Sequence, residues 1–219
     1  MNYLSYSLWG DDPIYNVGII RNAEQAKIFY ENWKMVVYHD NSVPIDTINT
    51  LQSLNVLCID ASNKNLYGMF WRFLASDLDD AEYVVFRDAD SRLSLREKLA
   101  VDDWIISGKT LHVMRDHPLH KIPYGNNSLG ILGGMWGIVG KRVDMTDMIN
   151  KFSKSRESSY GNDQAFLKQI YDIFYEDKIA HDEFFERNPF PIPRQNGRFI
   201  GERMDINDNP TCDDYKILL

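Results

Sequence analysis

The sequence predicts an α/β fold: a mixed, mostly parallel central sheet with helices on both faces. Short apolar runs alternate with amphipathic segments through the first hundred residues, as in parallel strands joined by helices. Acidic residues stand at the ends of three of these runs, either next to the run or one residue beyond it. The chain has 219 residues, 44% of them hydrophobic, which is enough for the core of one large domain or two small ones.

The first half of the chain contains four predicted strands, each an apolar run bounded by polar or turn-forming residues. The runs lie at residues 3–9, 35–38, 56–59 and 83–86. Asp40 follows the second run, Asp60 follows the third, and Asp88 and Asp90 follow the fourth. Because ligands of such sheets bind beyond the carboxyl ends of the strands, this shared placement of acids indicates a site there.

Helices are predicted between these strands from their caps and their spacing. Asp12 and Pro13 open the first helix, because Asp caps helices and Pro suits the first helical position. A second helix is predicted from Pro44, and a third, with an aromatic face, over residues 66–74. Ser94 begins a capping-box pattern that opens the helix after the fourth strand.

The second half of the chain is predicted to be less regular. A strand is predicted at residues 110–114, and residues 131–139 form an apolar run that carries three glycines. Further helices are predicted to begin at Asp144 and next to Asp163. After about Asp182 the chain is rich in Pro, Asn, Gly and Arg, which predicts irregular structure.

Composition argues against several classes of function. The formal net charge of −8 disfavours nonspecific binding to nucleic acid or to anionic membranes. No apolar run is long enough to span a bilayer, and the first residues do not resemble a signal peptide. The two cysteines, Cys58 and Cys212, lack metal-ligand spacing, so a reducing compartment such as the cytoplasm is expected.

Residues 86–90, Phe-Arg-Asp-Ala-Asp, carry the strongest chemical signal. Asp88 and Asp90 stand one residue apart at the end of a buried strand. Paired carboxylates there suit Mg²⁺ or Mn²⁺, and such an ion neutralises a diphosphate. Arg87 lies between the strand and these acids, and Arg72 stands among aromatic residues, where its charge needs a partner.

In this order, the motifs resemble the glycosyltransferases of the GT-A fold. The resemblance rests on Asp40, on Asp88 and Asp90 as the DxD motif, on the glycine-rich residues 133–137, and on Gly-Asn-Asp-Gln at residues 161–164, where a helix opens.

Residues 86–92, 114–118 and 133–137 together are similar to a compact subfamily of bacterial and large-DNA-virus sugar transferases, including the type of domain that glycosylates a chlorella virus capsid protein. The resemblance covers about residues 1–185, which are expected to form one nucleotide-sugar transferase domain. Residues 186–219 are expected to form an irregular tail that packs on this domain or acts as a lid.

The resemblance implies a metal-dependent enzyme of the hexosyltransferase type. It would move a sugar from a nucleoside-diphosphate sugar, with UDP-sugar the first choice, to a hydroxyl of a glycan or glycoprotein, in the host cytoplasm if the protein is viral. Mn²⁺ or Mg²⁺ would stabilise the departing diphosphate. The implied metal ligands are Asp88, Asp90 and His181, and Asp163 is the implied catalytic acid or base.

Contacts to the donor and to the acceptor follow from the same resemblance. The donor site is expected to contain Tyr6, Ser7, Gly10, Asp40, Arg72, Arg87 and Asp88. The sugar or acceptor is expected to contact Arg115, Asp116, His117, Gly134 and Trp136. His120 is expected to lie on the surface.

Three other functions remain open. A nucleotidyltransferase that makes nucleotide-sugars can share a related sheet, but it usually has a Gly-rich basic loop where this chain has Trp-Gly-Asp-Asp at residues 9–12. A haloacid-dehalogenase-type phosphatase carries a similar acidic motif, normally after its first strand. A sugar-binding module with a decayed site is the non-enzymatic alternative, which the retained Asp88, Asp90 and Asp163 disfavour.

Overall fold

A computed structural model describes residues 1–121, 129–154 and 162–219 of the chain. Its strands are β1 (Tyr3–Leu8), β2 (Lys34–His39), β3 (Leu57–Asp60), β4 (Tyr83–Arg87), β5 (Leu111–Arg115), β6 (Met135–Val139) and β7 (Lys178–Asp182). Its α-helices are α1 (Pro13–Phe29), α2 (Ile45–Ser53), α3 (Leu95–Ser107), α4 (Met145–Lys154) and α5 (Asn162–Ile173). Its 3₁₀ segments are η1 (Gly68–Asp77), η2 (Pro118–His120), η3 (Tyr175–Asp177) and η4 (Asp214–Leu218).

The strands form one seven-stranded sheet in the order β3-β2-β1-β4-β6-β5-β7. Strands β3, β2, β1 and β4 run parallel, β6 is antiparallel to both of its neighbours, and β7 pairs parallel to β5. The predicted mixed, mostly parallel α/β sheet is therefore confirmed. The Asp88–Asp90 turn follows β4, the fourth strand along the chain, and not a first strand as in the phosphatase alternative.

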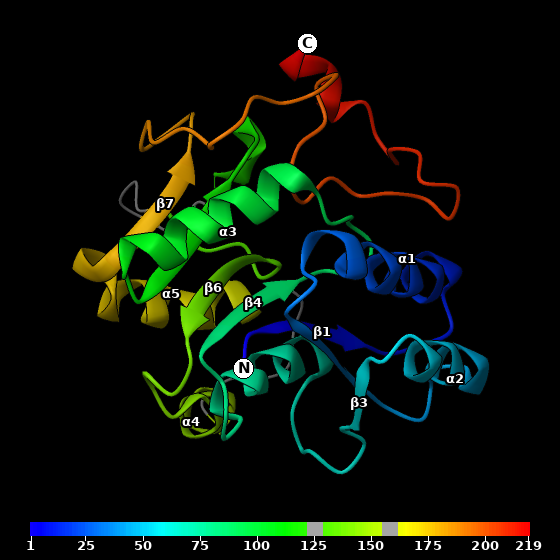
Figure 1. Ribbon diagram of the computed structural model, residues 1–219. Coiled ribbons are helices and arrows are strands. Elements are labelled where there is room, and N and C mark those ends of the chain that lie inside the picture. Colours follow the sequence, from blue (N-terminus) through cyan, green and yellow to red (C-terminus); the bar gives the residue numbers. More distant parts are fainter. Residues whose placement is uncertain (122–128, 155–161) are drawn as a thin grey trace.

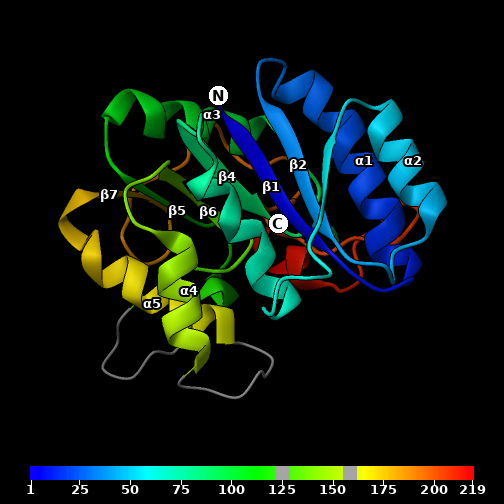
Figure 2. The same ribbon diagram turned by 90° about the horizontal axis from the view of Figure 1, so that it is seen from below.

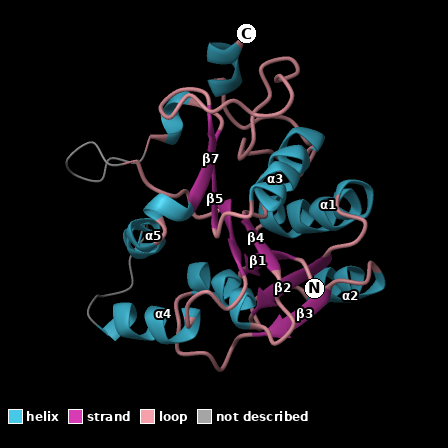
Figure 3. Cartoon of the chain, turned by 60° about the vertical axis from the view of Figure 1, so that its left-hand side comes forward, coloured by secondary structure: helices cyan, strands magenta, loops and turns pink. Residues whose placement is uncertain are grey.

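Helices cover both faces of the sheet, as predicted, and Figure 3 shows α4 and α5 on one side of it and α1, α2 and α3 on the other. Strand β1 illustrates the division, because side chains alternate along a strand. Leu4, Tyr6 and Leu8 pack in the core under α1, α2 and α3, whereas Tyr3 packs in the core that includes η1, α4 and α5. Helices α1 and α2 lie side by side (Figure 2).

The predicted helix caps form. The Asp12 side chain accepts a hydrogen bond of 2.9 Å from the Ile14 amide at the start of α1. Ser94 accepts a bond of 3.2 Å from the Glu97 amide at the start of α3. The Glu97 side chain does not complete the capping box, because its carboxylate is fully buried and lies 3.0 Å from the Arg87 guanidinium.

Two predicted segments differ in the structure. The helix predicted over residues 66–74 is the 3₁₀ helix η1, in which every residue from Gly68 to Ser76 is buried. With no solvent-facing side, this segment does not use the amphipathic face of an α-helix. Strand β7 was not predicted, because its sequence, Lys-Ile-Ala-His-Asp, has only two apolar residues, and pairing with β5 defines it.

The C-terminal tail packs against the domain. Figure 1 shows it, orange to red, running from the end of β7 towards the side of α1. Phe190 and Ile200 of the tail are buried in a cluster with Ala100 of α3, Met114 of β5 and Met135 of β6. Within the described residues, no helix has the length and apolar character needed to cross a membrane.

Candidate active site

A cavity of about 410 Å³ lies at the carboxyl ends of β1 and β4. Its walls come from residues 7–9 at the end of β1, from η1, from the Asp88–Asp90 turn, from the segment before β6, from the start of α5 and from Gly201 of the tail. Of the predicted site residues, the structure places five on this cavity: Ser7, Arg72, Asp88, Asp90 and Asp163.

The two acids of the DxD turn have different partners. The Asp88 carboxylate pairs with the Arg72 guanidinium, and Asp90 lies 3.0 Å from the guanidinium of Arg203 in the tail. Burial acts to raise the pKa of Asp88, but Arg72 lowers it overall. Burial and the neighbouring Asp88 charge raise the pKa of Asp90 to about 6.

Arg72 joins the DxD turn to Asp163. Its second terminal nitrogen lies 3.4 Å from the Asp163 carboxylate, at the start of α5. The Arg72 backbone is fixed on β1, because its amide donates to the Ser7 hydroxyl at 2.8 Å and its carbonyl accepts from Ser5 at 2.6 Å. Asp163 is buried, and burial raises the pKa of its carboxyl group, which makes it a stronger base.

The glycines before β6 allow the backbone to approach these acids. A Cβ atom on Gly134 would overlap the Asp88 carboxylate, and one on Gly133 would overlap the carboxylate of Asp163 and crowd the guanidinium of Arg72. Any larger residue at position 134 would therefore displace Asp88.

Aromatic side chains also line the cavity, and the sequence did not predict them as part of the site. Trp9 and Tyr67 line the cavity with side chains that are 41% and 38% exposed, and their ring centroids are 6.3 Å apart. Tyr15 of α1 lines the same cavity. Exposed large aromatic rings at a cavity offer a stacking surface for a flat ligand. The position of Trp9 directly after β1 is the sequence feature that could have indicated its place at the site.

His120 is not on the open surface, contrary to the prediction. It lines the cavity, and its Nδ1 accepts a hydrogen bond of 3.0 Å from the Asp116 amide. Burial, followed by nearby cations, lowers the pKa of His120 to about 3, so the ring is neutral near pH 7. With Nδ1 accepting, the ring proton is on Nε2.

Several predicted donor residues lie outside the cavity wall. Tyr6 is buried in the core. Arg87 is buried against Glu97 and donates to the Gly134 carbonyl at 2.5 Å. Gly10 and Asp40 are linked through Ser42 instead. The Gly10 amide donates to the Ser42 hydroxyl at 2.6 Å, and Asp40 accepts from the Ser42 amide at 3.0 Å. Gly10 itself has a φ of +75°.

The predicted acceptor residues are mostly structural contacts. Arg115 is fully buried and pairs with Asp182 and Glu186, and Asp116 is held by two arginines. His117 is buried, and its Nε2 lies 3.0 Å from the Asp214 carbonyl. Trp136 packs in the core against two phenylalanines. Gly134 borders the site through its close approach to Asp88.

His181, predicted as a metal ligand, does not lie with Asp88 and Asp90. Its ring nitrogens are 2.9 Å from His112 and 3.1 Å from Asp103. Strands β6 and β5 separate β7 from β4 in the sheet, which corresponds to roughly 14 Å at ordinary strand spacing. In the described part of the chain, no group of three His, Cys, Asp or Glu side chains is placed to hold a metal ion.

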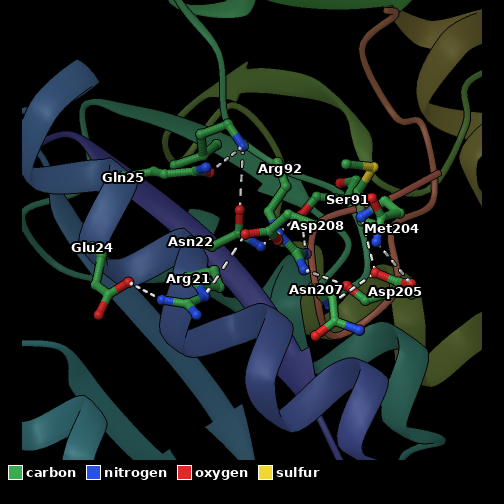
Figure 4. A network of polar contacts seen from close by, with 12 residues as sticks. Arg21, Asn22, Glu24, Gln25, Ser91, Arg92, Met204, Asp205, Asn207 and Asp208 are labelled. Carbon is green, nitrogen blue, oxygen red and sulfur yellow. Dashed lines mark hydrogen bonds and ion pairs between the residues drawn. The ribbon is translucent and has the colours of Figure 1, made fainter.

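A polar network behind the DxD turn fixes its backbone (Figure 4). Asn22 of α1 donates to the Ser91 carbonyl at 2.8 Å. Arg92 reaches to the tail, where it pairs with Asp208 at 2.6 Å and donates to the Asp205 carbonyl at 3.2 Å. The DxD turn, α1 and the tail are therefore joined. Gly161 of the predicted 161–164 motif lies outside the described residues.

No family model matches this sequence, and no curated protein matches it. Solved structures do. The galactosyltransferase LgtC, in complex with donor and acceptor sugar analogues, is 15% identical, with a TM-score of 0.54 over 84% of this chain and 74% of its own. The glycosyltransferase GlyE of Streptococcus pneumoniae is 14% identical, with a TM-score of 0.55 over 83% of this chain and 45% of its own.

The chain has the GT-A fold of glycosyltransferases. In this sheet the Asp88–Asp90 turn directly follows β4 and lines the cavity. A protein described as a glucose-1-phosphate thymidylyltransferase from Bacillus anthracis shares the sheet at 11% identity and a TM-score of 0.50. A glycosyltransferase involved in glycosylation of the major capsid of PBCV-1 matches at 11% identity with a lower TM-score, 0.49.

Proposed function

We propose that the protein is a metal-dependent glycosyltransferase that moves a sugar from a nucleoside-diphosphate sugar, with UDP-sugar as the first choice, to a hydroxyl of a glycan acceptor. One observation carries the proposal: Asp88, Asp90 and Asp163 meet at one cavity, where Arg72 joins Asp88 to Asp163. The GT-A fold supports it. Both cysteines are free, which agrees with a reducing compartment such as the cytoplasm.

The charges at the cavity favour a divalent cation. Three carboxylates, Asp88, Asp90 and Asp163, face two guanidinium groups, Arg72 and Arg203. A nucleoside diphosphate adds further negative charge, so its binding needs a compensating cation. Two carboxylates fit Mg²⁺ or Mn²⁺, which commonly take one or two protein carboxylates and complete their ligands with water and substrate phosphates.

In this proposal, Asp88 and Asp90 hold the metal ion, whose chemistry is to stabilise charge on the departing diphosphate. Arg72 positions Asp88 and Asp163, since it is buried and bonded to both. Trp9 and Tyr67 provide the stacking surface for the base. Asp163 contacts the reacting sugar or the acceptor hydroxyl, where its raised pKa suits proton transfer.

The test is isothermal titration of UDP into the protein with Mn²⁺ and then with EDTA. We expect micromolar binding that requires the metal, followed by slow hydrolysis of the matching UDP-sugar. Asp90→Asn should reduce metal-dependent UDP affinity at least about tenfold, because it removes a charged ligand. Asp60→Asn is the matched control, since Asp60 is an exposed acid at the end of β3, away from the cavity.

Normal Mn²⁺-dependent binding of UDP by the Asp90→Asn variant would contradict the assignment of Asp90 as a metal ligand. Absence of binding with UDP, GDP and dTDP alike would reject the nucleotide-sugar donor itself.

The shared sheet of the thymidylyltransferase favours a second candidate, a sugar-1-phosphate nucleotidyltransferase. Against it, the loop after β1 has two aspartates at positions 11 and 12 and no Lys or Arg to hold a triphosphate. Release of pyrophosphate from dTTP or UTP with a hexose-1-phosphate would favour this second candidate.

A further inference from the structure

Arg203 of the tail lies against the DxD turn. Its guanidinium is 3.0 Å from the Asp90 carboxylate and 3.3 Å from the Tyr15 hydroxyl. The backbone beside it is fixed, because the Met204 amide donates to the Asp90 carbonyl at 2.8 Å and the Arg203 carbonyl accepts from the Thr211 amide at 3.0 Å. The side chain itself is 49% exposed. The Arg203 guanidinium is thus half exposed, whereas the backbone that carries it is fixed.

The two arginines at the DxD turn differ in freedom. Arg72 is 8% exposed and holds Asp88 and Asp163 together, so it cannot leave without breaking the site. Arg203 is half exposed and leaves Asp90 at small cost, because partly exposed ion pairs are weak. Its planar fork also matches the oxygens of a diphosphate.

A divalent cation on Asp90 competes with Arg203. The carboxylate that would ligate Mn²⁺ or Mg²⁺ is the one that the guanidinium neutralises in the free protein. A guanidinium within hydrogen-bond distance of a ligand carboxylate repels a cation on the same group. Metal binding is therefore favoured when Arg203 has another anion to contact.

We propose that Arg203 is the counter-ion of Asp90 in the free protein and moves to the donor's diphosphate when the metal binds. This one side chain then couples metal binding to nucleotide binding, so that the metal binds tightly only together with the donor. The inference rests on the proposed function for the identity of the nucleotide.

The test compares wild type with Arg203→Gln by titration of Mn²⁺ in the absence of nucleotide, and then of UDP at saturating Mn²⁺. Without nucleotide, the variant should bind Mn²⁺ about fivefold more tightly, because the competing cation is gone. With Mn²⁺ present, it should bind UDP about tenfold more weakly, because the diphosphate loses a charged hydrogen-bond donor. A purely structural tail contact predicts no gain in Mn²⁺ affinity.

Arg21→Gln is the matched control. Arg21 also reaches the tail, 3.8 Å from Asp208, and its loss changes the net charge equally without touching Asp90. We expect both affinities to stay at the wild-type values in this control. Thermal melting of each variant checks that the fold is retained.

Unchanged or weaker Mn²⁺ binding in Arg203→Gln would overturn the competition, as would a failure of this variant to bind Mn²⁺ at all. If wild type binds no nucleotide, the proposed function and the diphosphate contact both fail. The Mn²⁺ titration without nucleotide still decides the competition at Asp90 in that case, so the two failures are distinguishable.

Discussion

At the scale of single residues, the pKa values of the three cavity carboxylates are shifted in different directions. Arg72 keeps the pKa of Asp88 below its usual value against the effect of burial. Burial raises the pKa of Asp163 and brings that of Asp90 to about 6. Asp88 is therefore ionised near neutral pH, whereas the charge of Asp90 changes close to pH 6.

Mn²⁺ affinity without nucleotide should fall as the pH drops from 7.5 to 5, with a midpoint near the pKa of Asp90, about 6. Below this midpoint a proton occupies the ligand oxygen, so we expect about a tenfold loss of affinity per pH unit. Titration calorimetry at four pH values measures it. A flat profile down to pH 5 would show that Asp90 does not ligate the metal.

Gly134→Ala should disturb the site more than the fold. The added Cβ overlaps the Asp88 carboxylate, so we expect Mn²⁺ and UDP affinity to fall at least about tenfold, with a stability cost of about 1–3 kcal/mol. Gly137→Ala is the control on β6, because its Cβ would press on Trp104 and not on Asp88. Equal loss of binding in both variants would point to a general packing defect.

At the scale of elements, β5 and β7 are joined by a buried histidine pair. His112 Nε2 lies 2.9 Å from His181 Nδ1, and the His112 ring stacks on Trp104. Burial, together with the neighbouring ring, lowers the pKa of His112 well below its ordinary value, and burial lowers that of His181. Both rings are neutral in the fold, and they fix the edge strand that the sequence did not reveal.

The histidine pair predicts an acid-sensitive edge of the sheet. A histidine whose pKa is lower in the folded state binds its proton on unfolding, so stability is full above about pH 6.5 and decreases below it. We expect the free energy of unfolding to fall by about 1 kcal/mol per pH unit for each histidine between pH 6.5 and 5.

His112→Phe should reduce this slope, whereas His39→Gln, at the end of β2, should not. Urea unfolding at several pH values measures the slopes. Equal slopes in wild type and His112→Phe would contradict the assignment to this pair.

At the scale of the whole molecule, the buried acid Asp116 helps to hold the tail on the domain. Asp116 pairs with Arg96 at 2.8 Å and with Arg194 at 2.5 Å, and it accepts from the Ile200 amide at 3.0 Å. These contacts join β5, α3 and the tail, and through the tail they position Gly201 and Arg203 at the cavity.

Asp116→Ala should release the tail. It removes the buried carboxylate that Arg96 and Arg194 share and leaves the partly exposed Glu183 as their remaining partner, so we expect a loss of about 1–3 kcal/mol of stability and faster proteolysis after β7. UDP affinity should fall with it, since the tail carries part of the site. Asp213→Ala, which removes an exposed pair with Lys216, should cost less than about 1 kcal/mol. An unchanged cleavage pattern in Asp116→Ala would contradict this role.

Local sequence patterns predicted most of the sheet and the centre of the site. The apolar runs, the caps at Asp12 and Ser94, and the acids after β4 all depend on neighbours within a few residues, whose chemistry is visible in order. Arg72 was also singled out, by its aromatic neighbours, and Asp163 by the family resemblance. The structure brings both to the cavity.

Contacts between residues far apart in the chain determined the rest. Arg115, Asp116 and His117 look like a site in sequence, but their partners lie in the tail and around β7, and those pairings make them structural. His181 contacts β5 and not the DxD turn, because β6 and β5 lie between β7 and β4 in the sheet. No local sequence pattern encodes this strand order. The sequence by itself determined the strands, the caps and the acids, since these follow from short-range chemistry. Only the tertiary structure decided which charges face the cavity and which hold the tail, because burial and pairing exist only once distant segments meet.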